Sequence, residues 1–172
     1  MNRRLIRHVL GGCLAAALAA GLAGCSRKAI STLDRKEAAN VISEAQFATT
    51  VRDLPRAETL ALQAATLCPD TGDYWLLLGT LQVRNGKKGD AKSSYASALD
   101  AYKDQYKQAP GNSQLLIQQA YVLVLMGRPD DARAVIDKAH DRNPDDWGIK
   151  KLVESKVVDH MVADPSLKAL SL

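Results

Sequence analysis

Histidines, cysteines and short polar motifs are the parts of this chain that could do chemistry, and they are sparse and scattered. His140 and His160 fall on predicted helices, without a cysteine or an acid at the paired short spacings of a zinc site. The Gly-Lys-Lys-Gly stretch at 86–89 lacks the preceding strand and the Gly-Lys-Ser/Thr ending of a phosphate-binding loop, and its glycines favour a hairpin turn. The sequence therefore predicts no catalytic residue, no bound cofactor or metal, and no enzymatic activity.

The first 24 residues have the composition of a secretory signal peptide. Arginines at positions 3, 4 and 7 precede an uncharged Ala/Leu/Gly run from Val9 to Gly24, which supplies the positive and apolar regions of such a signal. The run ends in Leu22-Ala23-Gly24-Cys25, which resembles the bacterial lipobox. The resemblance implies cleavage before Cys25 and attachment of fatty acyl chains, such as palmitate, to that cysteine. The alternative is a signal anchor that stays in the membrane, although the run is short for a span of about 20 apolar residues.

Cleavage at this site would change the charge and the cysteine count of the mature chain. Three of the 23 basic residues lie in the leader, which leaves 20 against 19 acidic residues and gives no case for a nucleic-acid surface. Cys13 is lost and Cys25 acylated, so Cys68 has no partner for an internal disulfide. Because Ser26 follows Cys25 where an Asp would signal inner-membrane retention, the resemblance implies the periplasmic face of the outer membrane if the cell has one.

The remaining chain is organised around a helical hairpin, which is clearest from Trp75 to Ala98. Large and small residues alternate across its expected seam, with apolar positions at helical spacing. They are Trp75, Leu78 and Gly79 on the first helix, and Ala91, Tyr95 and Ala98 on the second. One such hairpin cannot bury its outer faces, so it needs neighbouring copies.

This pattern resembles the tetratricopeptide repeat (TPR), a helical pair of 34 residues. Copies in register occupy about 38–71, 72–112 and 113–146. Ala61 departs from the usual aromatic residue, Glu44 and Gln119 from a usual Leu, and Pro110 comes seven residues late. The resemblance predicts an all-α fold: a short α-solenoid of about three TPR helix-turn-helix repeats plus a C-terminal capping helix.

The chain then divides into a signal peptide (1–24), an acylated Cys25 with a polar tether (25–36), a TPR domain (37–163) and a mobile tail (164–172). Asp34 followed by Glu37 predicts the start of the first helix. The capping helix is expected over 147–162, with one apolar stripe. The fourth helix is about two turns longer than its counterparts. Its Tyr102 and Tyr106 either pack on a neighbouring helix or form a second docking face, and the sequence leaves both open.

The resemblance also implies a binding groove, because the first helices of successive repeats line a concave surface in TPR proteins. The positions carried over by register are Ile42, Gln46, Thr49, Leu76, Thr80, Val83, Arg84, Ile117, Tyr121 and Val124. Only Arg84 is basic, so recognition of an acidic C-terminus is not expected. A mostly apolar groove, with Tyr121 and Arg84 as polar anchors, suits an amphipathic or hydrophobic segment. The alternative for each residue is burial between helices.

Two functions are consistent with these features. The first is a lipid-anchored adaptor or scaffold for envelope proteins, similar to the small lipoproteins that assist pilus or secretion-system assembly. The second is a regulatory adaptor that recruits or restrains an envelope protease or a peptidoglycan hydrolase. A short repeat stack could also form a homo-oligomer through its ends.

Overall fold

The computed structural model describes residues 29–172, so the predicted leader and Cys25 lie outside the described residues. Within this range the chain forms nine helices and no strand. They are α1 (Thr32–Thr50), α2 (Leu54–Leu67), α3 (Gly72–Arg84), α4 (Lys88–Gln108), α5 (Ser113–Leu125), α6 (Pro129–Arg142), α7 (Trp147–Glu154), α8 (Val157–Ala163) and α9 (Pro165–Leu170).

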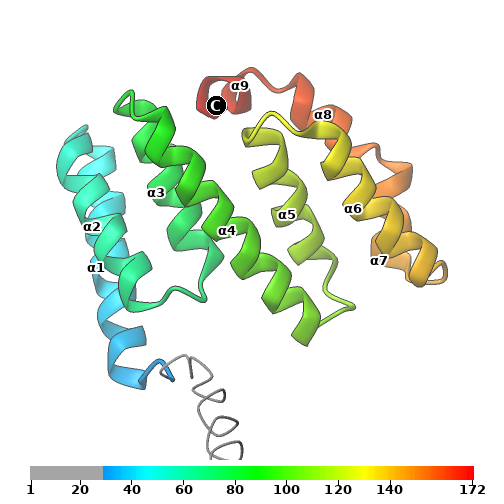
Figure 1. The fold of residues 1–172 in the computed structure, drawn as a ribbon, viewed down its shortest axis with the longest axis horizontal. Coiled ribbons are helices and arrows are strands. Elements are labelled where there is room, and N and C mark those ends of the chain that lie inside the picture. Colours follow the sequence, from blue (N-terminus) through cyan, green and yellow to red (C-terminus); the bar gives the residue numbers. More distant parts are fainter. Residues whose placement is uncertain (1–28) are drawn as a thin grey trace, which may run out of the picture.

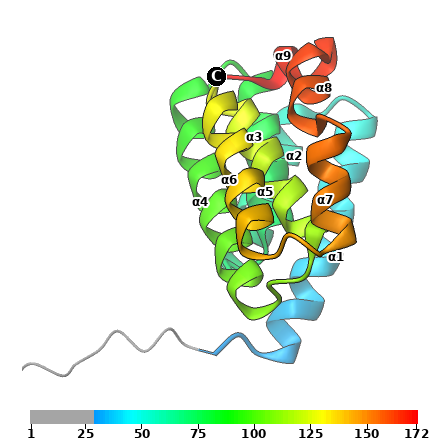
Figure 2. The same cartoon turned by 90° about the vertical axis from the view of Figure 1, so that its right-hand side faces the viewer.

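The first six helices form three hairpins that stack in chain order (Figure 1). Within each hairpin the two helices contact each other, and α2 contacts α3 as α4 contacts α5 and α6 contacts α7. The view turned by 90° shows α4 and α6 on one side of the stack and α1 and α7 on the other (Figure 2). The expected short all-α solenoid of helical hairpins is therefore confirmed.

Each hairpin turn is closed by a residue in the left-handed conformation. Gly86 (φ 77°) follows α3 and Gly127 (φ 72°) follows α5. In the first of these turns, Lys87 N donates to Gln82 O at 2.8 Å, which satisfies a carbonyl at the helix end. The first hairpin makes the same turn with Arg52 (φ 63°). A residue with a Cβ adopts this left-handed conformation less readily than glycine does.

The start of α1 differs from the prediction. Ser31, not Asp34, is the N-cap: its Oγ accepts from Asp34 N at 3.0 Å, and its own N–H donates to the Asp34 carboxylate at 3.1 Å. Asp34 is therefore the third residue of the first turn, and the reciprocal bonds make a capping box. Serine and aspartate are both common N-caps, and the observed N-cap lies three residues before the predicted one.

The seam of each hairpin pairs residues of complementary size. In the second repeat, a Cβ added at Gly79 would lie 2.5 Å from Tyr95 Cδ1, so the glycine makes room for the buried ring. The equivalent pairs are Ala45 with Ala61 in the first repeat and Ala120 with Ile136 in the third, all buried. The first hairpin thus has small residues on both sides of its seam, where Ala45, Ala48, Ala57 and Ala61 belong to one buried cluster.

Tyr102 belongs to the core and not to a docking face. Its side chain is 2% exposed, and Gly72 leaves space for its ring, since a Cβ there would lie 2.6 Å from Tyr102 Cε1. Its hydroxyl donates to Asp73 Oδ1 at 2.5 Å. Burial, followed by this bond, raises the pKa of Tyr102 far above its usual range. The docking interpretation is therefore wrong for Tyr102, whereas Tyr106 remains partly exposed.

The C-terminal part departs most from the prediction. The single capping helix expected over 147–162 is broken at Ser155 and Lys156, where Lys156 has φ 50°. The break lets α8 turn back onto α5 and α6. Beyond it, residues 164–172 are not a mobile tail. They form α9, which contacts α3 and α5, and Leu167 is buried.

Candidate functional site

The groove positions carried over from the repeat pattern lie on α1, α3 and α5, with different exposures. Gln46 and Arg84 are exposed, and Val124 is buried. The others are partly exposed: Ile42, Thr49, Leu76, Thr80, Val83, Ile117 and Tyr121. Among residues 29–172, no carboxylate forms an ion pair with Arg84. An apolar surface with one unpaired guanidinium therefore follows these three helices.

The threonines of this set add little polar character. Thr49 Oγ1 donates to Ala45 O at 2.8 Å, and Thr80 Oγ1 donates to Leu77 O at 2.8 Å. Both hydroxyl protons are therefore used within their own helices. Ile42 packs on the same small core as Trp75, between the first and second repeats. The polar groups that the groove offers to a ligand are therefore those of Gln46, Arg84 and Tyr121.

The two expected anchors, Arg84 on α3 and Tyr121 on α5, lie on the two helices beside Tyr95 of α4. Tyr121 packs against the core cluster that contains Tyr95. Burial raises the pKa of Tyr95, and the positive charge of Arg84 lowers it. The Tyr95 hydroxyl donates to Leu170 O at 2.8 Å. Thus α9 lies at the end of the groove that contains both anchors.

Further contacts hold the C-terminal residues in this place. Leu172 N donates to Leu125 O at 2.9 Å, and Lys88 Nζ donates to Ser171 O at 3.2 Å. A cavity of about 280 Å³ remains between α9 and the α5–α6 turn, and Val124 and Leu167 line it. The chain's own C-terminus therefore partly covers the groove where α3 and α5 end, and the rest of the surface of α1 and α3 is left open.

Sequence reasoning missed this covering segment, although a local signal was present. Asp164-Pro165 is a typical helix end, and α8 does end there, with Asp164 as its C-cap. In the structure Asp164 caps a new one, because its Oδ1 accepts from Ser166 N at 2.8 Å and proline stands at the first helical position. The leucines at 167, 170 and 172 then supply an apolar face to α5 and the core.

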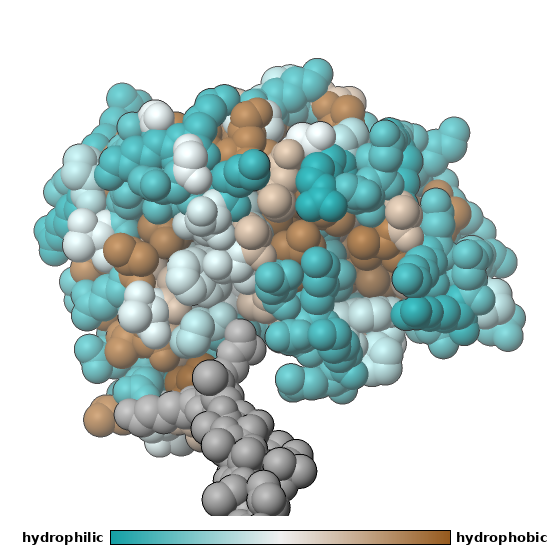
Figure 3. Space-filling model, viewed as in Figure 1, coloured by the Kyte–Doolittle hydropathy of each residue, from teal (hydrophilic) through white to brown (hydrophobic). Residues whose placement is uncertain are grey.

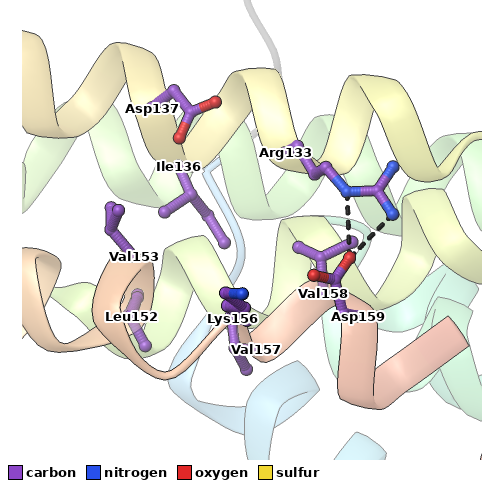
Figure 4. A pocket seen from close by; sticks show the side chains of 9 residues that line it. All are labelled: Arg133, Ile136, Asp137, Leu152, Val153, Lys156, Val157, Val158 and Asp159. Carbon is purple, nitrogen blue, oxygen red and sulfur yellow. Dashed lines mark hydrogen bonds and ion pairs between the residues drawn. The ribbon is translucent and has the colours of Figure 1, made fainter. Parts of the chain in front are cut away.

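A small cleft lies between α6 and the break that separates α7 from α8 (Figure 4). It has a volume of about 130 Å³, and Ile136, Leu152 and Val158 are among the side chains around it. Arg133 Nη2 donates to Asp159 Oδ1 at 2.8 Å and links α6 to α8 across one side. This exposed ion pair holds the pKa of Asp159 below its usual value. We interpret the cleft as a consequence of the helix break.

In the described part of the chain, the side chains that could bind a metal ion or act as nucleophiles are isolated from one another. No group of three or more His, Cys, Asp or Glu side chains between residues 29 and 172 could hold a metal ion. Cys68 is buried at the end of α2, and burial raises the pKa of its thiol, which disfavours the reactive thiolate. No helix in this range is both long and apolar enough to cross a bilayer.

Comparison with known families matches residues 91–153 to the tetratricopeptide repeat. The match begins in α4 and extends through α5 and α6 into α7. It supports a TPR protein, and proteins with such repeats typically act as non-enzymatic scaffolds that bind other proteins. No curated protein matches the chain. The geometry and the repeat match together favour a role in protein–protein interaction.

Proposed function

We propose that this protein is a lipid-anchored adaptor that binds protein partners in the cell envelope and helps a pilus or secretion system to assemble. One observation carries the adaptor role: α1, α3 and α5 present partly exposed apolar side chains beside the unpaired Arg84, on a rigid repeat scaffold. The lipobox-like sequence that ends at Cys25 supports the anchor. Together they would hold a client at the membrane surface while it assembles.

The second candidate is a regulatory adaptor for an envelope protease or a peptidoglycan hydrolase. It is favoured by the length of α4, which has 21 residues where α2 and α6 each have 14. The additional turns create surface outside the groove, which would let one molecule hold an enzyme and a second protein together. The identity of the groove partner distinguishes the two candidates.

The anchor is tested by replacing Cys25 with serine. Cells fed an alkyne-bearing palmitate should label the wild-type protein, and we expect the Cys25→Ser variant to lose the label and leave the membrane fraction. Several acyl chains attach a protein stably because each buried CH₂ contributes about 0.8 kcal/mol. Cys68→Ala is the matched control, since it removes the only other mature thiol and should retain full labelling. An unlabelled wild-type protein would contradict the anchor.

The groove is tested by a photo-activated cross-linking residue at Gln46 or Arg84, which are exposed on α1 and α3. We expect both positions to capture the same envelope protein in intact cells, and Arg84→Glu to reduce capture from position 46 several-fold. Lys92, exposed on α4, is the control position and should not capture it. Equal capture from all three positions would reject the groove. A pilus or secretion component as partner supports the first candidate, and a hydrolase supports the second.

A further inference from the structure

Helices α4 and α6 lie on the same side of the stack (Figure 2). A furrow lined by residues of both helices and of α5 lies between them. Its volume is about 390 Å³, and α5 forms its floor. Leu116 from α5 and Val135 from α6 are apolar lining residues, and Tyr106 from α4 faces the same space. Figure 3 shows hydrophobic surface here between hydrophilic surfaces over α4 and α6. We call this feature the α4–α6 furrow.

The furrow exists because α4 is longer than its counterparts. Seven additional residues lengthen a helix by about 10 Å. The end of α4 carries Lys103, Tyr106 and Lys107, and these form one wall. The first part of the extension is anchored through the buried Tyr102, so this wall is rigid. The extension therefore packs through one tyrosine and presents the other to the furrow.

The rim of the furrow is positively charged. Four cations line it, two from each wall, and no acidic side chain does: Lys103, Lys107, Lys138 and Arg142. Lys103 and Lys107 pair with Asp100 and Asp104 of their own helix, at 3.4 and 2.8 Å. Across residues 29–172, no ion pair involves Lys138 or Arg142. The α6 wall thus presents two cations that are not held in ion pairs.

The floor holds a polar group without a partner. Gln119 on α5 lines the furrow and is only 4% exposed, and its Nε2 makes no hydrogen bond to any described residue. Buried donors are nearly always paired in native proteins. The position corresponds to Leu78 in the second repeat, so packing does not require an amide there. The nitrogen is itself buried, so a ligand acceptor in the furrow would pair with it after the Gln119 side chain rotates toward the furrow.

We propose that the α4–α6 furrow binds an acidic segment of a partner protein, with an apolar side chain on the floor and carboxylates on the rim. Carboxylates would pair with Lys138 and Arg142, and a ligand oxygen would accept from Gln119 Nε2. An inorganic anion would pair with the rim but would not contact the apolar floor, so a peptide with an apolar side chain fits the furrow better. The protein's own tether does not fit, because residues 26–36 contain four basic residues and one acidic residue. This second site goes beyond the groove and does not depend on it.

The probe is a panel of fluorescein-labelled heptapeptides, each with four Asp or Glu and one Leu or Phe at varying positions. Binding to the full-length protein in detergent is followed by fluorescence anisotropy. We expect panel members to bind, and Lys138→Glu with Arg142→Glu to weaken binding at least tenfold. Gln119→Leu should weaken it several-fold and remain folded, since leucine is the usual residue there. Replacing the apolar residue of the peptide by Ser should also weaken binding at least tenfold.

The matched control makes the same charge change elsewhere. Arg56→Glu with Lys92→Glu, both exposed on other surfaces, should leave binding within about twofold of wild type. If this control variant loses as much peptide affinity, the peptide is attracted only by the net charge of the protein, and the proposed site is wrong. Displacement of the peptide by millimolar phosphate would indicate a simple anion site and overturn the peptide proposal. Absence of binding by every panel member, with circular dichroism showing folded protein, would also overturn it.

Discussion

Replacing Gly79 by alanine is expected to lower the free energy of unfolding by about 1 kcal/mol, and by no more than about 2 kcal/mol, although alanine is the better helix former. The new Cβ would lie 2.5 Å from Tyr95 Cδ1, in a seam without space. The ring cannot withdraw easily, because it is fully buried and its hydroxyl is bonded to Leu170 O. Overpacking of this kind costs about 1–3 kcal/mol, against a gain of about 1 kcal/mol in helix propensity. Urea unfolding followed by circular dichroism measures the balance.

Gly89→Ala is the matched control for this substitution. Gly89 lies in α4 with no heavy atom within 4 Å of an added Cβ, so the same change should stabilise the protein by a few tenths to about 1 kcal/mol. The two variants are thus expected to shift stability in opposite directions. A stabilising effect at both positions would show that the seam has room to relax.

The other repeats suggest a rescue for the Gly79 variant. The third repeat pairs Ala120 with Ile136 at the equivalent positions. In a Tyr95→Ile background, Gly79→Ala should therefore lower the free energy of unfolding much less than it does in the wild type, or raise it. A double-mutant cycle measures this coupling, which we expect to exceed about 1 kcal/mol. The same cost in both backgrounds would mean that the ring and the glycine do not compete for space.

The second large effect is expected at the C-terminal helix. Leu167→Ala should reduce the free energy of unfolding by about 2–3 kcal/mol, because the side chain is buried where α9 covers α5. Lys168→Ala, on the exposed side of the same helix, should change it by less than about 0.5 kcal/mol. Thermal or urea unfolding of the two variants measures the difference.

Hydrogen exchange would localise the change caused by Leu167→Ala. Amides of α5 and α9 should exchange faster, including Leu172 N–H, which is bonded to Leu125 O. The α1–α2 hairpin should be unaffected, because each unit of a repeat stack contacts mainly its neighbours. When α9 is loosened, that end of the groove is uncovered. A photo-activated residue at position 84 should then capture more of the partner protein than it does in the wild type. Unchanged protection of α5 would contradict the covering role of α9.

The sequence by itself determined the three hairpins, because their signals are local. Apolar residues at helical spacing mark the seams, Gly86 and Gly127 close turns, and Pro55 and Pro129 stand in the first turns of helices. Each of these preferences acts over a few residues. The three repeats expected at about 38–71, 72–112 and 113–146 therefore each correspond to one helical hairpin of the structure. The leader, the acylation of Cys25 and the lipid anchor stay predictions from the sequence.

Tertiary structure decided which surfaces of those helices are available. Tyr102 and Tyr106 lie four residues apart on one helix, yet one fills the space above Gly72 and the other faces the furrow. Lys156 interrupts a regular apolar stripe because α8 and α9 gain burial against α5 by turning back. Both outcomes depend on contacts between residues far apart in the chain, where burial outweighs local helix propensity. No pattern confined to one helix contains that information.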